Sequence, residues 1–167
     1  MLSALILVSD DRSWPLGDAR IASLVRTLSS LVPHAMAGVV GDLALVAARD
    51  DPGLRTLADH AGCAVFCGAD GFARARITAT RPMLLVLREG AALNAAFGEE
   101  VAERLDAAAV FAIRYEPRTL AQRLLPTLCP LAGLIAPRGL FAALDAKPTL
   151  RAIDTRGEML RARARSV

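Results

Sequence analysis

The chain has 167 residues, of which 54% are hydrophobic and 22% charged, and its formal net charge is +3. This length fits one domain over residues 1–167, and the apolar content is ample for a core. Aromatic residues make up only 4%, so the core must be mainly aliphatic, which favours an α/β sandwich over an all-β fold. The arginines are spread along the chain rather than clustered, which argues against a nucleic-acid-binding protein.

The three cysteines are an odd number without the dense spacing of a disulfide framework, which indicates reduced thiols and a cytoplasmic protein. No basic segment precedes the short apolar run at the start, so we expect no secretion signal. The longest apolar passage, Leu124–Leu144, contains three prolines and an arginine, and does not predict a transmembrane helix. Contact with a membrane surface stays open for this passage, and three roles stay open for its Leu124–Ile135 stretch: internal packing, a homodimer contact or contact with a membrane.

The first half of the chain predicts buried parallel strands with helices between them. Each strand is a continuous apolar run, and the longer ones end in polar or acidic loops. The expected strands are Leu2–Val8, Leu43–Ala47, Cys63–Cys67 and Met83–Leu87. Apolar residues at helical spacing predict a helix over 21–32 that ends at Pro33, a second helix after Asp50-Asp51-Pro52, and a short third helix over 72–78.

The second half continues the alternation of strand and helix. A helical face carrying Phe97, Val101 and Leu105 is followed by expected strands at Ala109–Tyr115 and Leu131–Ala136. The remaining expected elements are a Thr119-capped helix shortened by Pro126, a short helix over Arg138–Leu144, a strand over Leu150–Ile153 and a basic tail helix over Glu158–Arg165. The alternation predicts a three-layer sandwich with a mainly parallel, doubly wound sheet.

Five passages occur in a characteristic order: ALILVSDD, SLVP, LALVAARDDPGLRTLADHAGC, PMLLVLREGAAL and GLIAPRGLFAAL. Their order and spacing resemble those of the family 2 glycosyltransferases, and the resemblance covers most of the chain. It implies a GT-A fold, in which a sugar is transferred from a nucleotide-sugar donor to an acceptor hydroxyl. That chemistry uses a nucleotide site, a divalent cation such as Mg²⁺ or Mn²⁺, and a carboxylate base.

The resemblance also implies where the nucleotide and metal contacts lie. Nucleotide contacts fall on the loop after the first strand and the turn after the second, and a diphosphate contact follows the fourth: Ser9, Asp10, Asp11, Asp50, Asp51 and Arg88. Ala47 stands where the family has an aspartate. The family's Asp-x-Asp metal motif is replaced by Leu87-Arg88-Glu89-Gly90, in which Glu89 is the candidate metal ligand. Arg88 is the alternative partner of the diphosphate, because a guanidinium can pair with phosphate directly.

For the base, the resemblance points to Glu158, which is followed by Met159-Leu160-Arg161, with Asp154 as a second candidate. Simpler roles remain open for two acids, since Asp50 could only cap a helix and Glu158 could only be a favourable charge in a helix's first turn. The alternative function is a catalytically degenerate GT-A scaffold that acts as a binding or protein-interaction module. A nucleotidyltransferase is less favoured, because no glycine- and lysine-rich loop follows the first strand.

Overall fold

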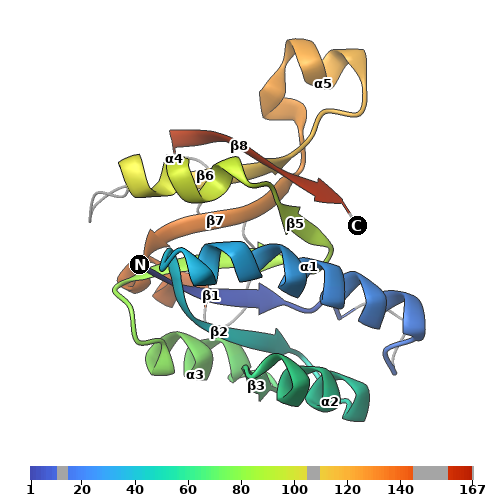
Figure 1. Cartoon of the computed structure of the whole chain (residues 1–167). Coiled ribbons are helices and arrows are strands. Elements are labelled where there is room, and N and C mark those ends of the chain that lie inside the picture. The colour runs from blue at the N-terminus through green and yellow to red at the C-terminus, as the bar shows by residue number, and fades with distance from the viewer. Residues whose placement is uncertain (11–14, 105–109, 145–157, 167) are drawn as a thin grey trace.

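The computed structural model describes residues 1–10, 15–104, 110–144 and 158–166. Strands and helices alternate along the chain (Figure 1). In chain order the elements are β1 (Leu2–Leu7), α1 (Asp18–Met36), β2 (Val40–Ala47), α2 (Pro52–Ala61), β3 (Ala64–Cys67), α3 (Gly71–Thr78), β4 (Met83–Arg88), β5 (Ala91–Leu93), α4 (Ala96–Arg104), β6 (Phe111–Tyr115), α5 (Leu120–Leu124), the 3₁₀ helix η1 (Pro126–Leu128), β7 (Leu131–Pro137), the 3₁₀ helix η2 (Arg138–Leu144) and β8 (Glu158–Ser166).

The described strands form one eight-stranded sheet in the order β3-β2-β1-β4-β7-β6-β8-β5. Strands β3, β2, β1 and β4 run parallel to one another, and β6 runs parallel to β8. Strand β7 runs antiparallel to both β4 and β6, and the short β5 runs antiparallel to β8. The predicted mainly parallel α/β sheet is confirmed, and the carboxyl ends of β1, β2, β3, β4 and β6 share one edge.

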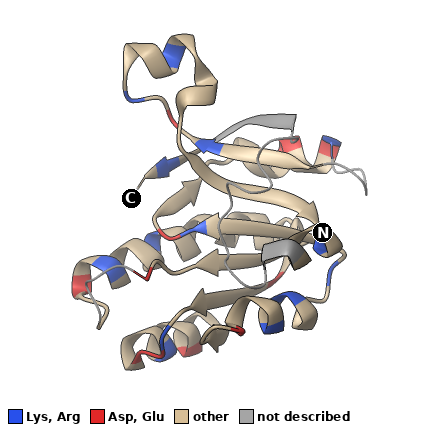
Figure 2. Ribbon diagram, turned by 180° about the vertical axis from the view of Figure 1, so that it is seen from behind, with Lys and Arg blue, Asp and Glu red and all other residues tan. Residues whose placement is uncertain are grey.

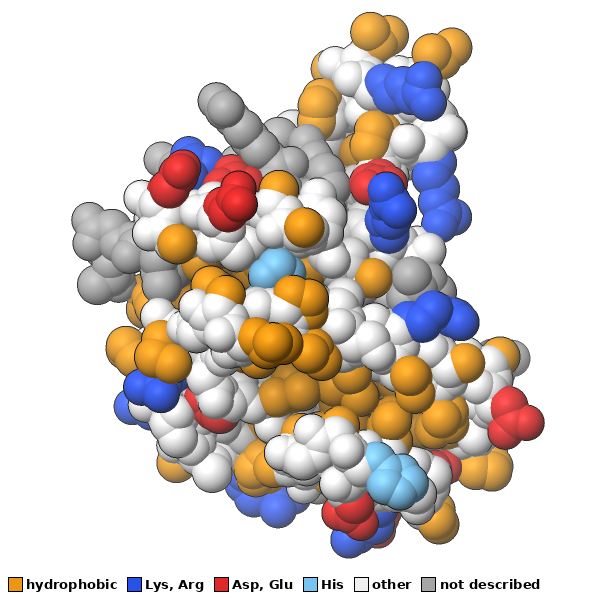
Figure 3. Space-filling view, viewed as in Figure 1, with side chains coloured by type: hydrophobic (Ala, Val, Ile, Leu, Met, Phe, Trp, Pro, Cys, Tyr) orange, Lys and Arg blue, Asp and Glu red, His pale blue; other side chains and the backbone are white. Residues whose placement is uncertain are grey.

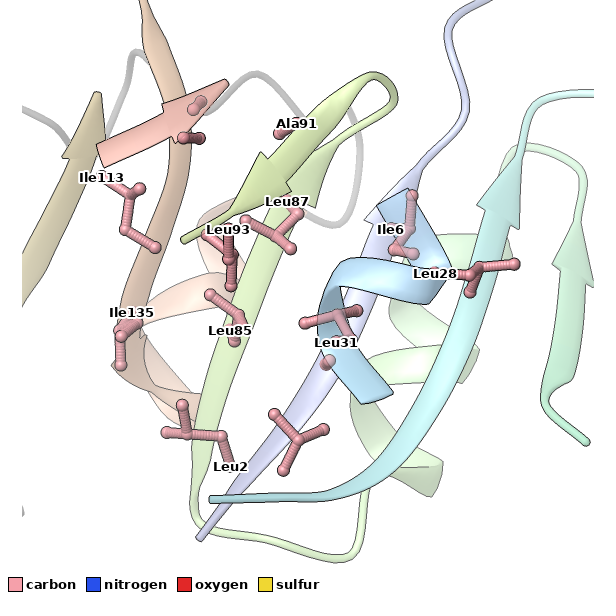
Figure 4. Close-up of a cluster of buried hydrophobic side chains, with 14 of the residues drawn as sticks. Leu2, Ile6, Leu28, Leu31, Leu85, Leu87, Ala91, Leu93, Ile113 and Ile135 are labelled. Atoms are coloured by element: carbon pink, nitrogen blue, oxygen red, sulfur yellow. The ribbon is translucent and has the colours of Figure 1, made fainter. Parts of the chain in front are cut away.

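Helices cover both faces of the sheet, which gives the three layers predicted. One face packs on α1, α2 and α4, with Leu28 and Leu31 of α1 lying over the strand residues Ile6 and Leu85 (Figure 4). The other face packs on α3 and η2, where the rings of Phe72 and Phe141 meet at 6.3 Å. Alternate residues of each strand point to opposite faces, so a continuous apolar run fills both cores.

Two expectations about helices are wrong, one about the expected tail helix and one about the residue at which α1 ends. The segment Glu158–Arg165 is not a tail helix but most of strand β8, whose described residue Ala164 is buried. It pairs with β6, and the sequence RARAR alternates small and charged residues with the period of a strand. Helix α1 continues through Pro33 to Met36, because Pro33 lies in the last turn and buried Leu31 and His34 keep that end packed.

Several expected features lie outside the described residues: Asp11, Leu105, the strand over Leu150–Ile153, and Asp154. Among the helices that the structure describes, none combines the length and the apolar character needed to cross a bilayer.

His34 is a buried titratable group at the end of α1. It is 3% exposed, and its ring meets that of Phe97 edge-on at a centroid distance of 5.1 Å. Burial lowers the pKa of His34, and a hydrogen bond with the backbone of Asn94 offsets part of that effect. The folded protein therefore holds this imidazole in its neutral form more strongly than the unfolded chain does.

We expect this burial to make the protein less stable in mild acid. The unfolded chain binds a proton at His34 near pH 6.5, before the native state does, so the free energy of unfolding falls as pH drops through and below that value. Urea unfolding of the wild type and His34→Gln at about pH 7.5 and about pH 5.5 measures the effect. The wild type should lose more stability than the variant, and equal losses would contradict the prediction.

Candidate functional site

A cavity of about 730 Å³ opens at the edge of the sheet where β1, β2, β3, β4 and β6 end. Acidic and basic positions lie together along this edge (Figure 2). The polar side chains that line the cavity are Ser9, Asp10, Arg88, Glu89 and Tyr115. Four of these five were sequence-predicted site residues, and they come from loops about 80 positions apart in the chain. The carboxyl edge of a parallel sheet is the usual place for a ligand in such folds.

Glu89 is held in a bidentate pair with Arg20 of α1. Arg20 Nε donates to Glu89 Oε1 at 2.8 Å, and Arg20 Nη2 donates to Oε2 at 2.6 Å. The two side chains are only 15% and 11% exposed, respectively. Both oxygens of the candidate metal ligand therefore already accept from a guanidinium.

The same pair fixes the loops after β1 and β4. The backbone N–H of Ser9 donates to Glu89 Oε2 at 2.9 Å, and Arg20 Nη2 donates to the Ser9 carbonyl at 2.7 Å. The Glu89 N–H in turn donates to the Leu7 carbonyl at 3.0 Å. Sequence reasoning missed Arg20, although a cation in the first turn of a helix opposes the helix dipole and signals a partner elsewhere.

Two further carboxylates along this edge, Asp10 and Asp50, also pair with arginine. Asp10 lies 3.3 Å from Arg49. Asp50, outside the cavity lining, accepts two hydrogen bonds from Arg55, at 2.6 and 2.7 Å. The Arg55 guanidinium lowers the pKa of Asp50. Arginine partners therefore take up much of the negative charge that these loops offer to a cation.

Asp51, not Asp50, caps helix α2. Its Oδ1 accepts from the Leu54 N–H at 3.1 Å, and its Oδ2 accepts from the Leu16 N–H at 3.0 Å. The residue is 3% exposed and does not line the cavity. Proline at the first helical position leaves the adjacent Asp51 in the N-cap place, so the capping role expected of Asp50 belongs to its neighbour.

Arg88 and Tyr115 complete the polar lining. Arg88 is exposed at the end of β4, and its side chain makes no hydrogen bond or ion pair within the part of the chain that the structure describes. Burial raises the pKa of Tyr115, and the nearby charges of Arg88 and Arg118 offset part of the rise. The Tyr115 hydroxyl therefore stays protonated near neutral pH and can donate a hydrogen bond. Sequence reasoning placed Tyr115 only at the end of a strand.

The candidate base Glu158 starts its strand at the end away from this cavity. Glu158 begins β8 opposite Phe111, whereas Tyr115 at the cavity lies opposite Ala164. The four residue steps from Phe111 to Tyr115 correspond to about 13 Å along the strand. Glu158 thus starts its strand at the end away from the cavity, and Asp154 lies outside the described residues.

The described residues offer no cluster of side chains that fits a metal ion. No group of three or more histidine, cysteine, aspartate or glutamate side chains suitable for a metal ion occurs among them. At the position of the Asp-x-Asp motif, Glu89 is saturated by Arg20, and Arg88 places a positive charge beside it. These residues do not fit a hard divalent cation, which takes several oxygen ligands.

No family model matches the sequence, and no curated protein sequence matches it. Three solved structures illustrate what the fold is similar to. Glucosyl-3-phosphoglycerate synthase from Mycobacterium tuberculosis, in complex with Mn²⁺, UDP and glucosyl-3-phosphoglycerate, has 13% identity and a TM-score of 0.59; the match covers 98% of this chain and 68% of that one. Mannosyl-3-phosphoglycerate synthase from Rubrobacter xylanophilus has 11% identity and a TM-score of 0.60, with 99% and 66% covered.

The third structure is 4-diphosphocytidyl-2C-methyl-D-erythritol synthase, with 12% identity, a TM-score of 0.62, and 96% and 88% of the two chains covered. A mycobacterial protein with 16% identity and a TM-score of 0.58 is also similar, and this chain spans 64% of its length. At these identities the likeness concerns the fold. The chain has the fold of the GT-A-like nucleotide-sugar transferases.

Proposed function

We propose that the cavity at the carboxyl edge binds a nucleotide-sugar and that Arg88 supplies the positive charge opposite its diphosphate. The observation that carries this proposal is the contrast between Arg88 and the acids around it. Asp10, Asp50 and Glu89 all pair with arginine, whereas Arg88 makes no ion pair with any described residue. A diphosphate would provide the missing negative charge, and a guanidinium matches its geometry.

The size of the cavity and the similar folds support the same ligand class. A volume of about 730 Å³ lies within the usual range for a small-molecule site. The Mycobacterium tuberculosis synthase was solved with Mn²⁺ and UDP-glucose. In this chain the motif position carries Arg88 in place of a metal-binding pair of acids, so we propose that nucleotide binding does not depend on Mn²⁺ or Mg²⁺.

The proposed activity is transfer of the sugar to an acceptor hydroxyl, in the manner of a divergent family 2 glycosyltransferase. The hydroxyl oxygen would bond to the anomeric carbon while the bond from that carbon to the diphosphate breaks, and the hydroxyl proton would pass to a base. Arg88 and the Tyr115 hydroxyl are suited to the charge that develops on the leaving diphosphate. Of the two candidate bases that the family resemblance implies, Glu158 starts β8 at the end away from the cavity, so we propose Asp154 for this role.

A second candidate function is a binding module that keeps the scaffold without transfer. It is favoured by one observation: the two carboxylates that line the cavity, Asp10 and Glu89, both face an arginine. Such pairing occupies carboxylate oxygens that an acceptor hydroxyl would otherwise contact. The two candidates share the ligand and differ in whether product forms.

Thermal unfolding against UDP-, GDP-, CMP- and dTDP-sugars, each with and without Mn²⁺, tests the proposal. A ligand at about a hundred times its dissociation constant adds about 2.7 kcal/mol to native stability, which raises the midpoint by several degrees. We expect one nucleotide class to raise it equally with and without the metal. A flat panel would overturn nucleotide-sugar binding, and a shift that requires Mn²⁺ would overturn the role given to Arg88.

With the donor identified, release of free nucleoside diphosphate in the presence of candidate acceptors separates the two functions. Release that depends on an acceptor supports transfer, and binding without release supports the module.

A further inference from the structure

The segment between β6 and β7 projects from the body of the protein and carries leucines on its outside. Helix α5 and the 3₁₀ helix η1 form this projection, at the top of Figure 1. Neither helix has a buried residue. We call its four exposed leucines the leucine tip: Leu120 (74% exposed), Leu124 (79%), Leu125 (58%) and Leu128 (54%).

Hydrogen bonds, rather than an apolar core, hold the projection in shape. Thr119 and Gln122 form a reciprocal capping box at the start of α5. At the base, the Tyr115 N–H donates to the Pro130 carbonyl at 3.0 Å, and Arg114 Nη1 donates to the Cys129 carbonyl at 2.8 Å. The fold therefore orders the leucines without burying them, which leaves their apolar surface for an outside partner.

The charges on the projection are all positive. Arg118 and Arg123 are exposed beside the leucine tip, and the sequence has no acidic residue from 117 to 144. Glu116, at the base, accepts a hydrogen bond from Arg165 at 3.1 Å. Figure 3 shows hydrophobic and basic side chains together on this projection. A partner that fits them is apolar inside and negatively charged at its surface.

We propose that the leucine tip inserts into the interfacial layer of a membrane that contains anionic lipid. The leucines would enter the acyl boundary, while Arg118 and Arg123 would contact lipid phosphates. A convex projection suits a lipid surface, because a soft bilayer supplies apolar volume around it without a preformed groove. The projection leaves β6 directly after Tyr115, so docking would hold the mouth of the cavity close to the bilayer.

Flotation of the full chain with vesicles tests this proposal. The vesicles contain phosphatidylcholine alone or with about 30% phosphatidylserine. We expect binding to the anionic vesicles, weaker binding at high salt, and little binding to the neutral ones. The double variants Leu124→Gln/Leu125→Gln and Arg118→Gln/Arg123→Gln should each reduce binding by about tenfold or more.

Matched control variants distinguish binding through the leucine tip from non-specific binding to vesicles. Met36→Gln and Ile77→Gln replace apolar residues that are 85% and 67% exposed on other helices, and Arg26→Gln removes an exposed arginine from α1. These variants should bind vesicles like the wild type. All variants should keep the wild-type unfolding temperature, since none of the replaced side chains is buried.

Three results would overturn the proposal: no binding to anionic vesicles at low salt, equal binding by the tip variants and the wild type, or equal binding to neutral vesicles. A dimer in solution that the Leu124→Gln/Leu125→Gln variant makes monomeric would also overturn it, because the leucine tip would then be a contact between copies. The vesicles carry no nucleotide, so the outcome is independent of the proposed nucleotide-sugar binding.

Discussion

Replacement of Glu89 by alanine is expected to lower the free energy of unfolding by about 3 kcal/mol. The substitution removes the carboxylate that pairs with the Arg20 guanidinium, which is 15% exposed, and it removes the acceptor of the Ser9 N–H. A mostly buried charge that loses a bidentate carboxylate keeps its desolvation cost and loses much of the compensating attraction. The loops after β1 and β4 then lose their shared anchor, and the cavity between them should loosen as well.

Urea unfolding measures this loss, with Asp70→Ala as the matched control. Asp70 also pairs with an arginine, Arg74, but the two side chains are 70% and 50% exposed, so that variant should lose less than about 1 kcal/mol. Equal stability of the two variants would contradict the role of the Arg20–Glu89 pair. If Glu89 binds a metal instead, Mn²⁺ would stabilise the wild type and leave Glu89→Ala unchanged.

Replacement of Arg88 by alanine is expected to weaken nucleotide-sugar binding by about 10- to 100-fold. This is the loss of affinity expected when a charge-assisted hydrogen bond to phosphate is removed. Stability should change by no more than about 0.5 kcal/mol, because the Arg88 side chain is exposed and makes no hydrogen bond or ion pair with the described residues. Titration calorimetry with the nucleotide identified by thermal unfolding gives the dissociation constant.

Two further variants make the Arg88 result specific. Arg26→Ala removes an exposed arginine that does not line the cavity, and it should bind like the wild type. Arg88→Lys keeps the charge but loses the planar fork, and its affinity should fall between those of the wild type and Arg88→Ala. An unchanged dissociation constant for Arg88→Ala would remove Arg88 from the site.

The first half of the fold follows closely from local sequence signals. Apolar runs that end in polar loops predicted β1, β2 and β4 to within a few residues. The end of α2 was also predictable, because Gly62 adopts a left-handed φ of 66° that favours glycine. These features depend on neighbouring residues, which is why the sequence alone was enough.

The second half depends more on tertiary pairing. Strand β5 has only three residues, too few for a periodic signal. The antiparallel direction of β7 comes from its place between β4 and β6, which no local pattern specifies. The basic residues of Glu158–Arg165 suit a solvated helical tail, which is why the sequence predicts a helix there. Pairing with β6 overrides that preference.

The sequence predicted where the candidate site lies in the fold, but it predicted only some of the residues that contact one another there. The rule that parallel strands end at one edge correctly brought Ser9, Asp10, Arg88 and Glu89 to one cavity. It gave no information on Arg20, which comes from a helix that covers one face and whose side chain turns to the loops. The roles of these residues in binding stay predictions.

The two edges of the sheet also determine how copies of this protein can meet. The outermost described strands are β3, with four residues, and β5, with three. Strands this short offer few unpaired backbone groups, so another chain gains little by extending the sheet there. Extension of the sheet through β3 or β5 themselves is thereby discouraged despite the high apolar content.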